Sequence, residues 1–136
     1  MNPVRDALYD RLAATAALTA LLSDPAALFH RVAPPEARTP VVVFTKQTGT
    51  PTWAFDGPPL RTDVWLVKAI DRSGSASLAE DIDAQIDLAL TDAPLAITGR
   101  TLLYLRRESD VDYPEQDGAE TFHHVGGLYR LITDPS

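Results

Sequence analysis

The 136-residue chain contains no cysteine, which excludes disulfides, thiol nucleophiles and thiolate zinc sites. It also lacks an apolar run long enough to span a membrane, which takes about 18 residues or more. The aliphatic run from Pro40 to Phe44 is among the longest it has. The start MNPVRDALYD has no apolar stretch of the kind a signal peptide requires. We therefore expect a soluble protein with no membrane partner.

Familiar catalytic and ligand-binding motifs are absent as well. No serine lies in G-x-S-x-G or S-x-x-K, and the glycines form neither G-x-G-x-x-G nor a P-loop. His123 and His124 are neighbours in a predicted strand, so their side chains point to opposite faces and cannot bind one ion together. An enzyme would need a perturbed cluster around His30, His123 or His124. We expect no catalytic residues, no cofactor and no metal.

Basic residues are outnumbered, with 12 Lys and Arg against 19 Asp and Glu and a net charge of -7. Residues 1–70 hold seven basic and six acidic residues, whereas residues 71–136 hold five basic and thirteen acidic ones. Twelve of the acids lie in two segments, 71–92 and 108–120. Such a chain lacks the basic patch that grips nucleic acid or an anionic membrane.

The first 22 residues predict a helix, with Asn2 as N-cap, Pro3 at the first helical position and a possible break within the alanine-rich stretch 13–20. Arg11 falls in the apolar stripe of this helix. Either its side chain extends to the edge of the stripe, or that edge meets another subunit. A short strand is predicted over 27–32.

The β-branched run 41–45 and the alternating segment 61–70 predict two strands. Residues 46–60 between them predict a long loop or a protruding hairpin that carries Trp53 and Phe55. Because exposed aromatics are enriched in interfaces, we take these two residues as interface candidates. The alternative is a loop that folds back to cover the sheet.

In the C-terminal half, Ser77 and Glu80 predict a capping box at the start of a helix that Pro94 stops. Glu80, Asp83 and Asp87 are predicted on its face away from the core, which is either a solvated face or a surface that meets a partner or lines a channel.

Beyond this helix, residues 95–98 and 101–107 predict two strands joined at Gly99, or one bulged strand. The segment 108–120, with Asp110 and Asp112, predicts an acidic loop. Residues 121–132 predict the last strand, in which Gly126 and Gly127 indicate a bulge or a close backbone approach.

This order of elements is typical of a single α+β domain over residues 1–136. We expect a mainly antiparallel β-sheet with two α-helices packed on one face.

The order and type of these segments resemble the tail terminator family of long-tailed bacteriophages, also called tail completion or head-tail joining proteins. The resemblance rests on the segments VRDALYDRLAATAALTALL, FHRVAPPEARTPVVVF, RTDVWLVKAI, SLAEDIDAQIDLAL and TFHHVGGLYRLI. It covers nearly the full length, but residues 46–60 and 108–120 match only in position.

The resemblance implies a structural virion protein and no enzyme. Proteins of this family form a ring, usually a hexamer, on the last ring of the tail tube, where they end its polymerisation and join the tail to the head. The implied partners are other copies of the chain, the tail tube protein and a head completion or connector protein, in the neck of the virion after assembly in the host cytoplasm. DNA would pass without specific binding, and the acids Glu80, Asp83, Asp87, Asp110 and Asp112 are candidates for a channel lining or an acidic outer surface.

Two alternatives stay open at this point. One is another neck, head completion or minor tail protein of the virion. The other is a small-molecule-binding α+β module, which predicts a monomer with a dry pocket near Trp65.

Overall fold

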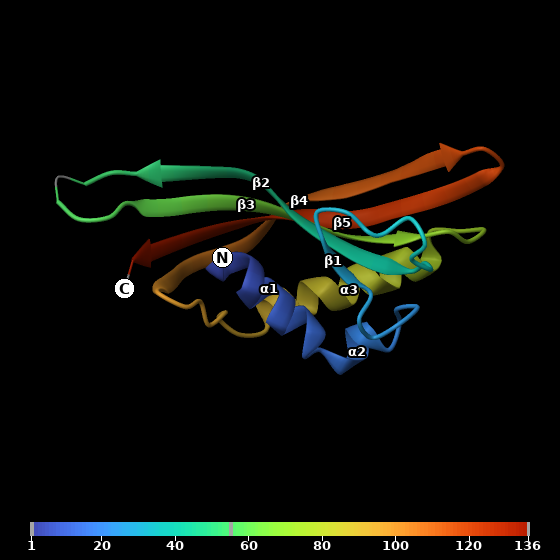
Figure 1. The fold of residues 1–136 in the computed structure, drawn as a ribbon, viewed down its shortest axis with the longest axis horizontal. Coiled ribbons are helices and arrows are strands. Elements are labelled where there is room, and N and C mark those ends of the chain that lie inside the picture. The colour runs from blue at the N-terminus through green and yellow to red at the C-terminus, as the bar shows by residue number, and fades with distance from the viewer. Residues whose placement is uncertain (1, 55, 136) are drawn as a thin grey trace.

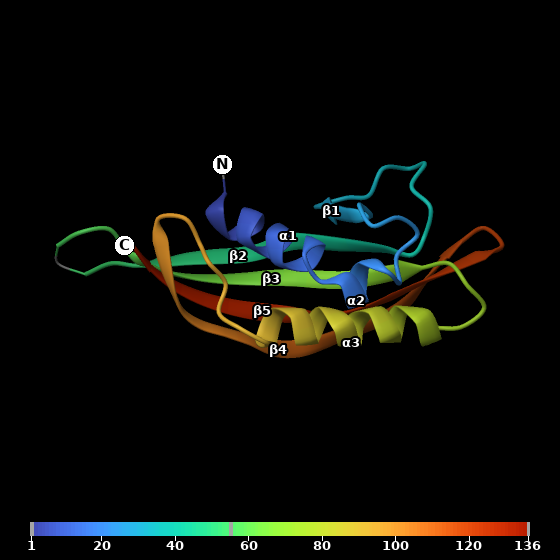
Figure 2. The same ribbon diagram turned by 90° about the horizontal axis from the view of Figure 1, so that it is seen from below.

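A computed structural model describes residues 2–54 and 56–135 of the chain. The elements are α1 (Pro3–Ala13), α2 (Ala16–Thr19), β1 (Leu28–His30), β2 (Val41–Thr52), β3 (Leu60–Asp71), α3 (Ser77–Thr91), β4 (Arg100–Asp117) and β5 (Glu120–Pro135). The strands form one sheet in the order β1-β2-β3-β5-β4, in which only the β1–β2 pair is parallel. The helices lie together on one face of this long sheet (Figures 1 and 2). This confirms the predicted α+β class. The structure has three helices where two were expected, because the short α2 is separate from α1.

The N-terminal helix begins and breaks where the sequence indicates. The Asn2 side chain accepts hydrogen bonds from the backbone N–H groups of Val4 and Arg5 at 3.1 and 3.2 Å, which satisfies two donors that the first turn leaves free. Helix α1 ends at Ala13, and Thr15 is the N-cap of α2. The predicted break in the alanine-rich stretch is confirmed.

Helix α3 covers the centre of the sheet with the side chains Ala79, Ile82, Ile86, Ala89 and Leu90, all of them buried. The predicted capping box at its start is wrong. The N-cap is Ala76, and no side chain caps the helix from that position. Instead, the Ser75 hydroxyl accepts a hydrogen bond from the Ser77 N–H at 3.3 Å.

Strands β2 and β3 form a long hairpin that continues through most of residues 46–60. Their pairing runs from Val41–Ile70 to Thr52–Leu60, with an irregularity between Lys46 and Thr48. The protruding hairpin is therefore the correct alternative for this segment. Strand β2 ends at Thr52 and β3 begins at Leu60, at one end of the long axis (Figure 1).

The predicted acidic loop over 108–120 is wrong, because nearly all of these residues belong to β4 and β5. The two strands pair from Arg100–Pro135 to Asp117–Glu120 around a turn at Gly118, whose φ is +63°. Strand β4 is at the edge of the sheet, so one side of its backbone faces solvent. Charged residues and Pro114 are tolerated in such an edge strand because no further strand has to pair there.

Residues 95–98 do not form a strand, which corrects both predictions made for this segment. The backbone there makes only an isolated bridge between Ile97 and Arg100 around Gly99, whose φ is +76°. Strand β4 starts at Arg100 and bulges between Leu102 and Tyr104 and between Arg107 and Ser109.

The close backbone approach predicted for the last strand is found at Gly126. A Cβ at this position would collide with the carbonyl oxygen of Val67 and with Lys68 on the paired strand β3. Only glycine fits there without a shift of the backbone.

The core lies between the helices and the sheet, where Phe44, Trp65 and Tyr129 are its largest fully buried side chains. Trp65, Val67 and Ala69 are the buried side chains of β3 that pack in this core. In the part of the chain that the structure describes, no helix has the length and apolar character that a membrane span requires.

Candidate assembly surfaces

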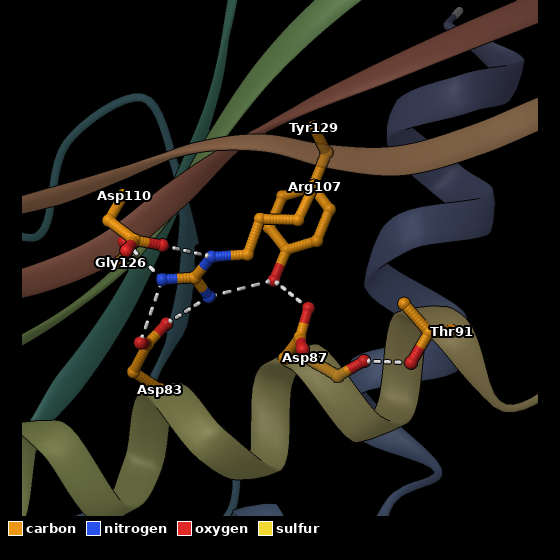
Figure 3. Close-up of polar contacts among 7 residues, drawn as sticks. All are labelled: Asp83, Asp87, Thr91, Arg107, Asp110, Gly126 and Tyr129. Atoms are coloured by element: carbon orange, nitrogen blue, oxygen red, sulfur yellow. Dashed lines mark hydrogen bonds and ion pairs between the residues drawn. The ribbon is translucent and has the colours of Figure 1, made fainter.

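A polar cluster joins helix α3 to the edge of the sheet. Arg107 on β4 donates from its two terminal nitrogens to the two carboxylate oxygens of Asp83, at 2.8 and 3.0 Å (Figure 3). Its Nε donates to Asp110 at 2.9 Å, and one terminal nitrogen also donates to the carbonyl of Gly126 at 2.7 Å. We call Asp83, Asp87, Arg107, Asp110 and Tyr129 the Arg107 cluster. A two-pronged Arg–carboxylate pair fixes geometry as well as charge, so the cluster sets the position of α3 on the sheet.

Tyr129 extends the Arg107 cluster along the helix. Its hydroxyl donates to Asp87 at 3.1 Å and accepts from Arg107 at 3.3 Å (Figure 3). The tyrosine is fully buried, and this burial raises its pKa, so it remains a neutral donor. The hydrogen bond to Asp83 raises the pKa of Arg107, which is charged in any case.

Gly127 makes room for the Arg107 side chain. A Cβ at Gly127 would lie 2.7 and 2.8 Å from the Nε and Cζ atoms of Arg107. The guanidinium therefore occupies the space that a side chain on β5 would take. The adjacent glycines of the last strand thus serve two purposes, since Gly126 lets β3 approach and Gly127 lets Arg107 reach α3.

The predicted acidic face of α3 is only partly at the surface. Glu80 is exposed, but Asp83 and Asp87 point to the sheet edge and bind Arg107 and Tyr129. The buried arc of the helix includes Ala79 and Leu90, so Asp83 and Asp87 lie beside this arc and not opposite to it. The description of all three acids as a face away from the core is therefore corrected for Asp83 and Asp87.

The Arg11 side chain extends from α1 to the C-terminal end of α3. Its guanidinium donates to the backbone carbonyls of Ala89, Ala93 and Pro94, at 2.8, 2.8 and 3.0 Å. These oxygens lie at and just after the C-terminal end of α3, where carbonyls lack helical partners and the helix dipole favours a cation. This intramolecular contact ties α1 to α3 and explains a cation in the apolar stripe.

Trp53 lies just beyond the end of β2, at the turn of the β2–β3 hairpin, with 70% of its surface exposed. It therefore does not fold back over the sheet. Phe55, the second aromatic of this turn, lies outside the described residues. A largely exposed tryptophan at the end of a hairpin is an unusual feature for an isolated domain and is typical of an interface anchor.

The acids of the second segment point into solvent along the β4–β5 hairpin. Asp112 is exposed, and the Asp110 side chain is 83% exposed although it contacts Arg107. Glu108 and Glu120 are exposed as well but pair with Arg130 and Arg72, both at 2.7 Å. Glu115 lies 2.9 Å from Nε2 of the buried His124. Burial lowers the pKa of His124, and the hydrogen bond with Glu115 partly opposes this shift.

His30 lies on β1, whereas His123 and His124 lie on β5. Over residues 2–54 and 56–135, no group of three or more His, Asp or Glu side chains is placed to bind a metal ion. His30 packs against the rings of Phe44 and Trp65, and burial is the main cause that lowers its pKa. Trp65 is fully buried in this contact, so the space beside it is filled by side chains of the core.

The fold and these surfaces together indicate the class of protein. The chain is an α+β domain. Asp83 and Asp87 of segment 71–92 bind other parts of the fold, whereas the acids of segment 108–120 are exposed. An exposed tryptophan lies at the end of a hairpin. These features are typical of a component that assembles with other proteins.

The comparisons with known proteins agree with this class. The family model described as "Tail completion protein gp17" matches residues 6–129, so the chain belongs to the tail completion protein gp17 family. It is thus a structural component of the tail of a phage-type virion. No curated protein matches it.

One solved structure has the same fold over nearly the whole length. It is a chain in the "Virion of native gene transfer agent (GTA) particle", with a TM-score of 0.75 and 17% sequence identity. The match covers 97% of this chain and 96% of that chain. The likeness at this low identity concerns the fold.

Proposed function

We propose that copies of the chain form a hexameric ring, which sits on the last ring of the tail tube. There it ends polymerisation of the tube and joins the tail to the head. The family match over residues 6–129 is the observation that carries this proposal. Its partners are then other copies of the chain, the tail tube protein and a head completion or connector protein. Assembly takes place in the host cytoplasm, and the finished ring lies at the neck end of the tail.

The shape of the chain supports a ring. The two long hairpins turn at opposite ends of the molecule, and the two ends differ in chemistry (Figures 1 and 2). One end carries the exposed Trp53, whereas the other carries the acids of residues 108–120. Unlike ends favour head-to-tail contacts, which close into a ring when the rotation between copies allows it.

The acidic surface supports a passage for DNA without specific binding. Glu80, Asp110 and Asp112 are the exposed members of the predicted acidic set, so they are the ones we place toward the channel. Like charges there would repel the phosphate backbone and keep the DNA from adhering to the wall. The same ring needs no catalytic residue, cofactor or metal, and we propose that the chain is not an enzyme.

The proposal is tested by electron microscopy of tail tubes assembled with and without the chain. We expect a ring at one end of each tube and a narrow distribution of tube lengths when the chain is present, and long uncapped tubes when it is absent. Leu88→Ala, which removes an exposed apolar side chain of α3 that no described contact uses, is the matched control and should cap tubes as the unaltered chain does. Tubes that stay uncapped with the unaltered chain would contradict the proposal.

A further inference from the structure

An open groove of about 550 Å³ lies on the sheet face opposite the helices. Its floor is apolar and combines two residues of β2 with one residue each of β3 and β5, namely Val41, Val43, Ile70 and Phe122. One wall is the segment 31–39 with Pro34, Pro35 and Ala37, and the other is the end of the β4–β5 hairpin. The charged side chains of the lining are Arg31 and Lys68 on one hand and Glu115 and Asp117 of the hairpin on the other.

The groove and Trp53 lie at opposite ends of one strand. Val41, at the start of β2, forms part of the floor, whereas Trp53 follows Thr52 at the end of the strand. Eleven residue steps of extended chain span roughly 36 Å, at about 3.3 Å per residue. The groove wall formed by 31–39 lies in the half of the molecule that holds the β4–β5 turn, and the β2–β3 turn is at the far end (Figures 1 and 2). Trp53 therefore cannot reach the groove of its own chain.

The groove has the chemistry that an indole ring requires. A tryptophan buries on the order of 150–250 Å² when it enters a pocket. Ile70, Phe122 and the proline wall offer apolar surface to it, whereas Val41 and Val43 are already buried. The cation of Arg31 can lie over the face of an indole, which is the aromatic ring that attracts cations best, whereas Lys68 already donates to the Tyr113 hydroxyl at 2.8 Å.

One wall of the groove is complementary in charge to the Trp53 turn, because Arg31 lies on the 31–39 side whereas Glu115 and Asp117 line the other side. Asp56, three residues from Trp53, is an exposed acid in the same turn. Arg31 is an exposed cation at the groove, and its backbone is held at φ +76°, a conformation that is uncommon for a residue with a side chain. The Arg31 N–H donates to the carbonyl of Phe44 at 3.0 Å, which fixes the start of the groove wall against β2.

We propose that Trp53 of one copy of the chain inserts into the groove between residues 31–39 and the β4–β5 hairpin of a second copy. The contact is head-to-tail, because each copy offers Trp53 at one end and the groove at the other. This inference rests on the proposed ring and names the residues that join one subunit to the next. A tip-to-tip contact between two Trp53 residues would instead give a closed dimer with both grooves empty.

The absence of cysteine from the chain allows a direct test by disulfide trapping. One variant carries Ala54→Cys, next to Trp53, and the other carries Val32→Cys, a 75% exposed residue that lines the groove. The two variants are mixed under mild oxidation, with and without tail tubes. The matched control mixture pairs Ala54→Cys with Leu88→Cys, whose side chain is exposed on α3.

We expect the tip and groove cysteines to cross-link at least about tenfold faster than the control pair, because docking raises the local concentration of one thiol at the other. Trp53→Ala added to the Ala54→Cys variant should remove this advantage. Equal rates for the two mixtures, with and without tubes, would overturn the inference. Preferential formation of Ala54→Cys homodimers would overturn it as well, in favour of the tip-to-tip contact.

A second readout separates this inference from the proposed ring. The chain has two tryptophans, of which Trp53 is exposed and Trp65 is fully buried. Assembly should therefore shift the fluorescence of Trp53 to the blue and protect it from acrylamide, whereas Trp65 is protected already. If Trp53→Ala still forms rings on tube ends, the docking contact is wrong and the ring stands. If the unaltered chain cross-links tip to groove but leaves tubes uncapped, the docking contact stands and the proposed function is wrong.

Discussion

The two acidic segments of the chain have the same number of acids but different roles in the structure. Residues 71–92 and residues 108–120 each hold six Asp or Glu side chains. In the first segment, Asp71 is buried and Asp83 and Asp87 bind Arg107 and Tyr129. In the second, Asp112 points into solvent and Asp110 stays largely exposed despite its contact with Arg107.

The difference follows from what lies opposite each acid. Helix α3 packs on the sheet, so the acids on its flank meet a cation and a phenol that rise from β4 and β5. The β4–β5 hairpin extends along the edge of the sheet, where its acids stay exposed even when they pair with an arginine, as Glu108 does with Arg130 and Glu120 with Arg72. A count of charges along the sequence therefore does not distinguish acids that hold the fold together from acids that are free for a partner.

The largest effect is expected from Arg107→Met, which removes the cation that binds Asp83 of the first segment. Asp83 would keep its charge at a site where only about 15% of its side chain is exposed, without its partner. Removing one member of a buried pair costs about 3–5 kcal/mol, and this pair is only partly buried, so we expect a loss of about 2–3 kcal/mol in the free energy of unfolding. Urea denaturation measures it.

Arg106→Met is the matched control for this change. Arg106 is the exposed neighbour of Arg107, and its described contact is with the ring of Tyr104. Its loss should change the free energy of unfolding by no more than about 0.5 kcal/mol. Equal losses for the two arginines would contradict the role of the Arg107 cluster.

A smaller effect is expected from a matched pair of neutralising changes, one in each acidic segment. Asp83→Asn weakens the two-pronged contact with Arg107 and should lower the free energy of unfolding by about 1–2 kcal/mol. Asp112→Asn should leave it within about 0.5 kcal/mol. Thermal unfolding followed by circular dichroism compares the two variants. A larger loss for Asp112→Asn would reverse the comparison between the segments.

A smaller effect, on the pH dependence of stability, is expected from His124. Glu115 of the second segment contacts this buried histidine. Because burial lowers its pKa, the unfolded chain binds this proton near pH 6.5 and the folded chain binds it only at lower pH. The free energy of unfolding should therefore be fully retained above about pH 6.5. It should then decline as the pH falls, by at most about 1.4 kcal/mol per pH unit for this one group.

His30, whose pKa burial also lowers, contributes in the same direction. His124→Asn should make the decline shallower, whereas His123→Asn serves as the matched change at the adjacent position. Urea denaturation from pH 7.5 to 5.5 provides the slopes. A slope that is unchanged in His124→Asn would show that this histidine does not titrate as described.

The smallest effect on stability is expected from reversing the exposed acids, which tests their proposed role toward DNA. Glu80→Lys with Asp112→Lys should fold with nearly unchanged stability and still form rings, because neither acid makes a described contact that holds the fold. DNA ejection from particles that carry this variant should be slower. Ejection at the rate of the unaltered particles would contradict the channel placement of these acids.

Elements with a strong local signal could be predicted from the sequence. The β-branched run 41–45 and the alternating run 61–70 lie in β2 and β3, and Asn2 caps the first helix. The hairpin over 108–120 could not be predicted, because Pro114, Gly118 and closely spaced acids are turn signals when read locally. Pairing with β5 at an open sheet edge overrides these propensities, and that edge exists only in the folded sheet.

The surfaces were less predictable than the fold. The exposed Trp53 follows from its place in a polar, proline-rich segment, as the sequence indicates. The contacts of Arg107 with Asp83 and of Arg11 with the end of α3 join residues 24 and 78 or more positions apart, and no spacing in the sequence marks them. The groove is equally hidden, since segment 31–39 forms it with four strands of the folded sheet.

The central claim, that this tail completion family member caps the tail tube as a ring, is tested most directly by cryo-electron microscopy of tube ends assembled with the chain. The account predicts a closed ring of this fold at the tube end, with Trp53 of each subunit in the groove of the next and Asp112 toward the channel. Tube ends without a ring of this chain would contradict the account.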